Sequence, residues 1–75
     1  GKERARWEAK VKKLEALLEE CDARTAALQA ELHSEDTVSD YVRLTELQAE
    51  LVRVEEQHLE YLEAWDDLQN QSFAE

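Results

Sequence analysis

The sequence predicts an all-α protein, folded as a two-helix antiparallel coiled-coil hairpin. Its 75 residues include one glycine and no proline, so few positions suit a tight turn and long helices are favoured. Ala, Glu, Lys, Leu and Arg dominate, which is typical of coiled coils and long helices. Apolar or small residues also recur in two stripes with alternating spacings of three and four, the 3.5-residue period of a heptad seam.

The first stripe predicts a helix over about residues 3–33. It consists of Trp7, Val11, Leu14, Leu18, Cys21, Thr25, Leu28 and Leu32. Good helix formers fill most of the positions between these residues, which supports one continuous helix.

A polar interval over residues 34–38 predicts a turn, and a second helix is expected over about 39–70. Thr37 with Asp40 fits a capping box, and Ser39 is an alternative N-cap. The second stripe consists of Leu44, Leu47, Leu51, Val54, His58, Tyr61, Trp65 and Leu68. Residues 71–75 lack the pattern and are expected to form a frayed tail, so the whole chain is interpreted as a single helical hairpin.

The short interval leaves no room for a parallel return, so the two stripes should pair antiparallel. One register then pairs every layer, from Leu28 with Leu47 near the turn to Trp7 with Leu68 at the open end. The predicted hairpin core consists of all the residues of both stripes except Thr25 and His58. Because two helices cover each seam only on one side, docking on a parent protein or self-association is also expected.

Charge narrows the possible functions. A net charge of −10 argues against a general nucleic-acid or membrane binder, and no apolar stretch reaches the roughly 20 residues of a membrane span. We therefore expect a cytoplasmic protein without membrane contact. One region departs from this acidity, because the first 13 residues hold six basic residues and only two acidic ones. The basic residues are Lys2, Arg4, Arg6, Lys10, Lys12 and Lys13.

Two interpretations of this basic run remain open. It is either a solvated helix end, paired with the acidic residues Glu60, Glu63, Asp66 and Asp67 of the second helix, or a local contact for RNA or DNA phosphates. Aromatic residues at Tyr41, Trp7 and Trp65 could add base stacking only where they are exposed.

No residue pattern predicts catalysis. The sequence has no Gly-rich phosphate loop, no nucleophile elbow and no His-Glu-x-x-His, so we expect no catalytic residues and no cofactor in this chain. Cys21 and His58 are the soft-ligand pair on the seam, and two ligands are too few for a closed metal site. We interpret Cys21 as a small apolar seam residue and His58 as a residue at the seam edge, with an adventitious metal or redox site as the alternative.

Several segments together resemble the C-terminal coiled-coil domain of bacterial ABC-F ATPases of the Uup-like group, which are described as ABC transporter ATP-binding proteins. The segments are Leu14-Glu15-Ala16-Leu17, Ser39-Asp40-Tyr41, Leu44-x-x-Leu47-Gln48-Ala49-Glu50-Leu51 and Tyr61-Leu62-Glu63-Ala64-Trp65-Asp66-Asp67-Leu68. The resemblance covers nearly the whole chain, and the last segment is its most specific part.

The resemblance implies a parent protein with two nucleotide-binding domains, which would bind ATP and Mg outside these residues. It implies that the hairpin contacts those ATPase domains and positions the parent on the ribosome, RNA or DNA. That contact would fall on the six basic residues of the first helix, although members credited with DNA binding carry more Lys and Arg than this chain. The alternative is a structural coiled-coil spacer or dimerisation module without nucleic-acid binding.

Overall fold

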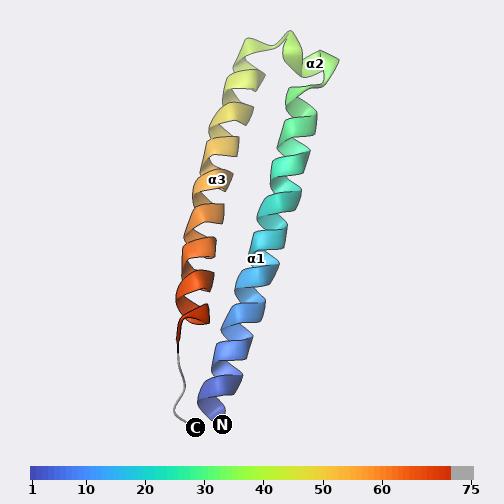
Figure 1. Cartoon of the computed structure of the whole chain (residues 1–75). Helices are drawn as coiled ribbons and strands as arrows, with labels where there is room; N and C mark the ends of the chain where they lie inside the picture. Colours follow the sequence, from blue (N-terminus) through green and yellow to red (C-terminus); the bar gives the residue numbers. More distant parts are fainter. Residues whose placement is uncertain (72–75) are drawn as a thin grey trace.

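The computed structural model describes residues 1–71 and confirms the predicted all-α hairpin. Helix α1 spans Lys2–Leu32, a short α2 spans Glu35–Val38, and α3 spans Tyr41–Gln69. Figure 1 shows α1 and α3 running antiparallel, with α2 at the tip. Of the tail expected to fray, Gln71 follows the end of α3 outside any helix, and 72–75 lie outside the described residues.

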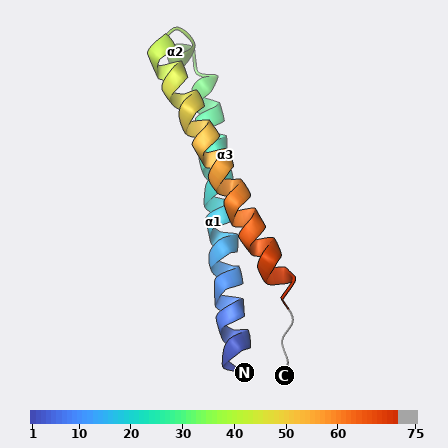
Figure 2. The same ribbon diagram turned by 90° about the vertical axis from the view of Figure 1, so that its left-hand side faces the viewer.

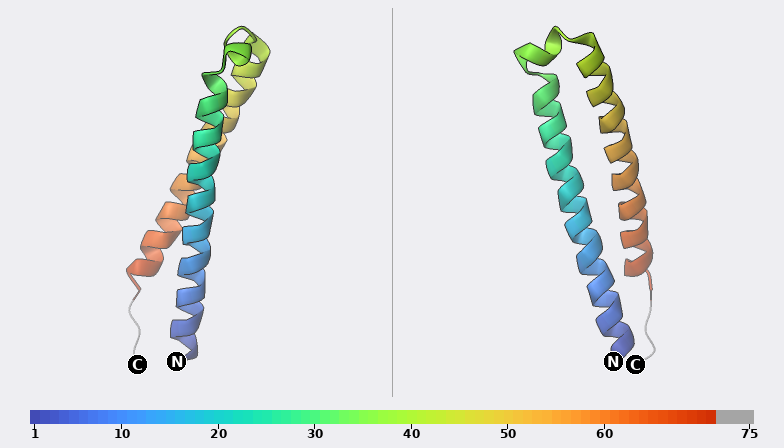
Figure 3. Two further views of the ribbon diagram at one scale, coloured as in Figure 1. Left: turned by 90° about the vertical axis from the view of Figure 1, so that its right-hand side faces the viewer. Right: turned by 180° about the vertical axis from the view of Figure 1, so that it is seen from behind.

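The molecule is a thin rod whose Cα atoms extend over 59 × 14 × 12 Å. The long helices cross at a shallow angle, as in a coiled coil (Figures 2 and 3). At the end opposite the tip, the indole N–H of Trp7 donates to the backbone oxygen of Leu68 at 2.6 Å. The residues of α1 that precede Trp7 therefore extend beyond the end of α3, as Figure 1 also shows.

The seam between α1 and α3 contains the residues of both stripes, each of which is buried or half-buried. Leu47 has no exposed surface, and it clusters with Cys21, Leu28 and Val54. Three half-buried residues pack against this cluster: Leu32, Leu51 and Tyr61. The cluster contains Leu28 and Leu47, the predicted pair near the turn, and also Cys21 and Val54, which the same register places opposite each other.

The capping pattern at the tip differs from the prediction. Asp40 is itself the N-cap of α3, and its Oδ1 accepts the backbone N–H of Arg43 at 3.1 Å. The capping box expected between Thr37 and Asp40 is therefore wrong, because Thr37 lies inside α2 and is buried. Ser34 caps α2 by accepting the N–H of Thr37, whereas Ser39 is the C-cap of that helix.

Ion pairs between α1 and α3 reinforce the single register. Arg24 pairs with Glu50 near the middle of the rod, and the Nε of Arg43 lies 3.1 Å from Oε1 of Glu31 near the tip. The arginines are exposed and the glutamates half-buried, so water still screens each pair and each adds little stability, about 0.2–1 kcal/mol. Their main effect is to oppose a slip of one helix along the other.

Candidate nucleic-acid interface

The six basic residues named above all lie in the first half of α1 and are all exposed. We call them the basic start. Because α1 begins at Lys2, the whole set is carried on one helix, and its first members lie beyond the end of α3. The positive end of the helix dipole is at the same place and adds to their potential. A chain with a net charge of −10 thus has one positive end.

Helical geometry divides the basic start between two faces. Lys2, Arg6, Lys10 and Lys13 follow one another at intervals of four, four and three residues, which places them on one face of α1. We call these four residues the basic stripe. At about 1.5 Å per residue the stripe is about 16 Å long. Arg4 and Lys12 fall outside it, and Nε of Arg4 lies 3.4 Å from Oε1 of Glu8.

Lys10 and Lys13, the second half of the stripe, lie beside the final turns of α3. Lys10 and Lys13 line a shallow hollow of about 380 Å³, together with Leu14, Ala64, Asp67 and Leu68. Asp67 is thus a carboxylate of α3 that the fold brings next to the stripe. Within residues 1–71, however, no carboxylate forms an ion pair with Lys10, Lys12 or Lys13. All three lysines are exposed, so their ammonium groups can pair with an external anion.

The aromatic residues are less available for stacking at this end. Trp7 and Trp65 are half-buried in the seam, and the indole of Trp7 is held by its hydrogen bond to Leu68. The Nε1 atom of Trp65 is buried and has no hydrogen-bond partner in the described part of the chain. Tyr41 is 80% exposed, but it lies at the opposite end of the rod. Among residues 1–71, the basic start therefore presents charge without an exposed aromatic platform.

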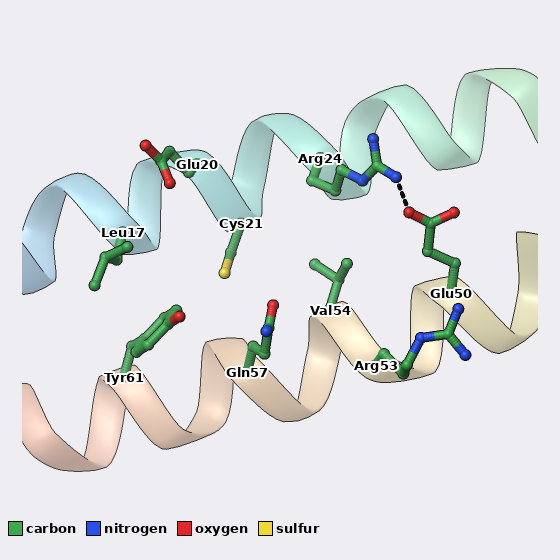
Figure 4. Close-up of a pocket in the computed structure, with 9 residues that line it drawn as sticks. All are labelled: Leu17, Glu20, Cys21, Arg24, Glu50, Arg53, Val54, Gln57 and Tyr61. Carbon is green, nitrogen blue, oxygen red and sulfur yellow. Dashed lines mark ion pairs between the residues drawn. The ribbon is translucent and has the colours of Figure 1, made fainter.

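Cys21 and His58 lie on different sides of the seam. Figure 4 shows Cys21 facing the space between the helices, where a hollow of about 330 Å³ is lined by Val54, Gln57 and Tyr61 among others. Burial, together with the charges of Asp22 and Glu20, raises the pKa of Cys21 above its ordinary value of 9.0, which keeps the thiol neutral and unreactive near neutral pH. Nε2 of His58 instead lies 3.4 Å from Oδ1 of Asp22.

Residues 1–71 contain no group of three or more His, Cys, Asp or Glu side chains placed to hold a metal ion. In the same part of the chain, no helix combines the length and the apolar character needed to cross a bilayer.

The arrangement of the basic start was only partly predictable. The intervals within the basic stripe can be read from the sequence once the helix is assigned, and they separate Lys13 from its neighbour Lys12. The proximity of Asp67 depends on the register, and the pairing of Arg24 with Glu50 depends on side-chain conformation. The register predicted from the two stripes already places Asp67 near the basic start, whereas heptad spacing does not determine the pairing of Arg24 with Glu50.

By its fold, the chain is an antiparallel coiled-coil hairpin, and one end of that hairpin is positively charged. The chain belongs to the ABC transporter C-terminal domain family. The family model matches residues 2–70, which include both long helices and the tip. This finding confirms the resemblance at the level of a C-terminal domain of an ABC transporter-related protein. Searches of curated proteins and of solved structures found no match.

Proposed function

We propose that this hairpin is the C-terminal appendage of a cytoplasmic tandem ABC ATPase of the ABC-F, Uup-like group. Its basic start contacts nucleic-acid phosphates and thereby positions the ATPase on DNA or on the RNA of the ribosome. ATP and Mg bind in the nucleotide-binding domains of the parent, with which the hairpin makes its other contacts. The family supports the role of an appendage, and the charge distribution supports the nucleic-acid contact.

The basic stripe is the observation that carries this proposal. Four exposed cations on one helix face can neutralise several phosphates at once, and each neutralised phosphate releases condensed counterions. Such contacts position a protein without reading base sequence. The chain's acidity repels nucleic acid at long range, so we expect binding that is local, modest in affinity and strongly dependent on salt.

Fluorescence anisotropy tests this directly, with labelled duplex RNA and duplex DNA titrated against the 75-residue chain at several salt concentrations. The double variant Lys10→Glu/Lys13→Glu should weaken binding about tenfold or more. For each cation removed, the slope of log affinity against log salt should fall by about 1. Circular dichroism of the variant shows whether the helices are retained.

A matched control separates the stripe from general charge effects. Lys12→Glu and Lys13→Glu change the net charge equally at adjacent exposed positions, but Lys13 alone belongs to the stripe. Lys13→Glu should therefore weaken binding more than Lys12→Glu. Equal losses would show that the stripe has no special role, and unchanged binding in both would refute phosphate contact by this face.

The competing spacer or dimerisation function gives different results in the same preparations. A dimerisation module would not bind either duplex, and its mass and thermal stability would rise with protein concentration. The ABC-F assignment has a separate test in the parent reading frame. Two copies of Gly-x-x-x-x-Gly-Lys-Ser/Thr, joined by a helical linker, are expected upstream of this domain.

A further inference from the structure

Large exposed hydrophobic side chains are confined to one part of the described structure. They are Val38, Tyr41, Val42, Val52, Leu59 and Leu62. All of them lie on α2 and α3, and α1 carries none. The two long helices therefore differ in their exposed surface. The large apolar side chains of α1 lie along the seam, whereas α3 also exposes large apolar side chains outside it.

Part of that surface forms a second heptad stripe on α3. The residues directly after seam residues Leu51, His58 and Tyr61 are Val52, Leu59 and Leu62, which are 52%, 56% and 43% exposed. Continued at alternating intervals of four and three, this pattern gives the outer stripe: Tyr41, Thr45, Gln48, Val52, Glu55, Leu59, Leu62 and Asp66.

Each residue of the outer stripe directly follows a seam position, so the outer stripe is rotated from the seam by a constant angle about the axis of α3. One residue step turns an α-helix by about 100°, so the outer stripe lies on a face next to the one that holds α1. Two neighbouring heptad faces allow one helix to pack against two others, as in a bundle. The corresponding positions on α1 are mostly charged and include Glu15, Glu19 and Asp22, so only α3 has this second face.

Two hollows lie along the outer stripe. Leu59 and Glu55 line one of about 380 Å³ together with Asp22, Thr25 and His58, so this hollow spans both long helices. The second, of about 400 Å³, is lined by Leu62, Glu63, Trp65 and Asp66. Each hollow therefore combines apolar surface with carboxylates at its rim.

The rim charges indicate what can dock there. Glu55, Glu63 and Asp66 on α3 carry carboxylates, and a fully apolar or acidic helix would leave them buried and unpaired. Asp22 on α1 adds a fourth carboxylate, which lies beside His58. Packing two copies through their outer stripes would bring Glu55 of each chain towards the carboxylates of the other. The chemistry instead suits a helix with apolar residues along one face and Lys or Arg beside them.

We infer that the outer stripe of α3 is the docking face for a basic amphipathic α-helix of another protein or domain. The incoming helix lies along α3, places its apolar residues against Val52, Leu59 and Leu62, and pairs its cations with the carboxylates at the rim. The hairpin then becomes a three-helix bundle. This surface is separate from the basic stripe on α1, and its role does not depend on nucleic-acid binding.

The test uses a synthetic helical peptide of about 28 residues, four heptads with Leu at the seam positions and Lys beside them. It is titrated into the 75-residue chain by calorimetry, and the affected amides are mapped by NMR. We expect one peptide per chain, with the largest shifts between Tyr41 and Asp66. A scrambled peptide of equal composition, without an apolar face, should bind at least about tenfold more weakly.

Matched variants locate the site on α3. Val52→Ser should weaken peptide binding several-fold, and Val52→Ser/Leu59→Ser about tenfold or more, whereas Val42→Ser, at an exposed valine outside the stripe, should leave binding unchanged. Likewise, Glu55→Lys should weaken binding more than Glu60→Lys, which makes the same charge change outside the outer stripe. All the substituted side chains are exposed, so melting temperatures should change little.

Three outcomes would overturn the inference. Equal binding of the scrambled peptide would show attraction by charge alone. Equal effects of Val42→Ser and Val52→Ser would show that the outer stripe is not the site. A dimer of the free chain that Val52→Ser/Leu59→Ser converts to a monomer would show that the face is occupied by a second copy.

Discussion

Leu47 has no exposed surface and lies in the apolar cluster formed with Cys21, Leu28 and Val54. Leu47→Ala should lower the free energy of unfolding by about 2–5 kcal/mol, because the lost side chain leaves a cavity that two helices cannot fully close. Leu62→Ala, at a residue that is 43% exposed, should change it by about 0.5 kcal/mol or less. Urea denaturation followed by circular dichroism measures both, and similar losses in the two variants would contradict the burial pattern.

Cys21 should make stability depend on alkaline pH. Its pKa is raised in the folded chain, chiefly by burial, so the folded state disfavours the thiolate. The resulting stability is fully present below the thiol pKa of the unfolded chain and is lost as pH rises through the higher folded pKa. Above the ordinary value of 9.0, the melting temperature should therefore fall more steeply for the native chain than for Cys21→Ala. Thermal melts of both proteins from about pH 7 to 10.5 measure this, and parallel curves would contradict it.

At the scale of whole elements, Asp40 determines where α3 begins. Its carboxylate accepts the N–H of Arg43, so Asp40→Ala should cost about 1 kcal/mol of stability. Ser39→Ala is the control, because the hydroxyl of Ser39 donates to the backbone oxygen of Asp36 at an exposed site and does not cap α3. Thermal melts should show a clearly larger decrease for Asp40→Ala, and a larger decrease for Ser39→Ala would reassign the cap.

The sequence predicted the two long helices but not which residues cap the helices at the tip. The seam residues repeat with a period that only a buried helical face produces, so both long helices and their antiparallel pairing were predictable. The tip was not, because Ser34, Thr37, Ser39 and Asp40 are all good capping residues and local preference does not choose among them. The choice follows from α2, a helix of four residues that occupies the expected turn.

The same contrast applies to the candidate site. The basic start was evident from composition, and its division into faces follows from helical geometry. The outer stripe was missed because polar residues such as Gln48 and Glu55 interrupt it, and because exposure of Val52 and Leu59 becomes evident only when α1 is in place.

For the whole molecule, the closed hairpin predicts a specific size in solution. X-ray scattering at low protein concentration should give a radius of gyration close to the 17.3 Å of the Cα atoms. If the tip opened so that α1 and α3 joined into one helix, the molecule would be about 100 Å long at about 1.5 Å per residue. A scattering profile of that length would show that the chain exchanges helices with another copy instead of folding on itself.

The rod has a mechanical consequence. Its length of 59 Å, against a width of 14 × 12 Å, separates the cationic end from the tip near Tyr41 by most of the molecule. If the cationic end is held on a partner, a tilt of about 10° there moves the tip by about 10 Å. Anchored in this way, the hairpin would act as a lever arm, in which a small rotation at the base becomes a large displacement at the far end.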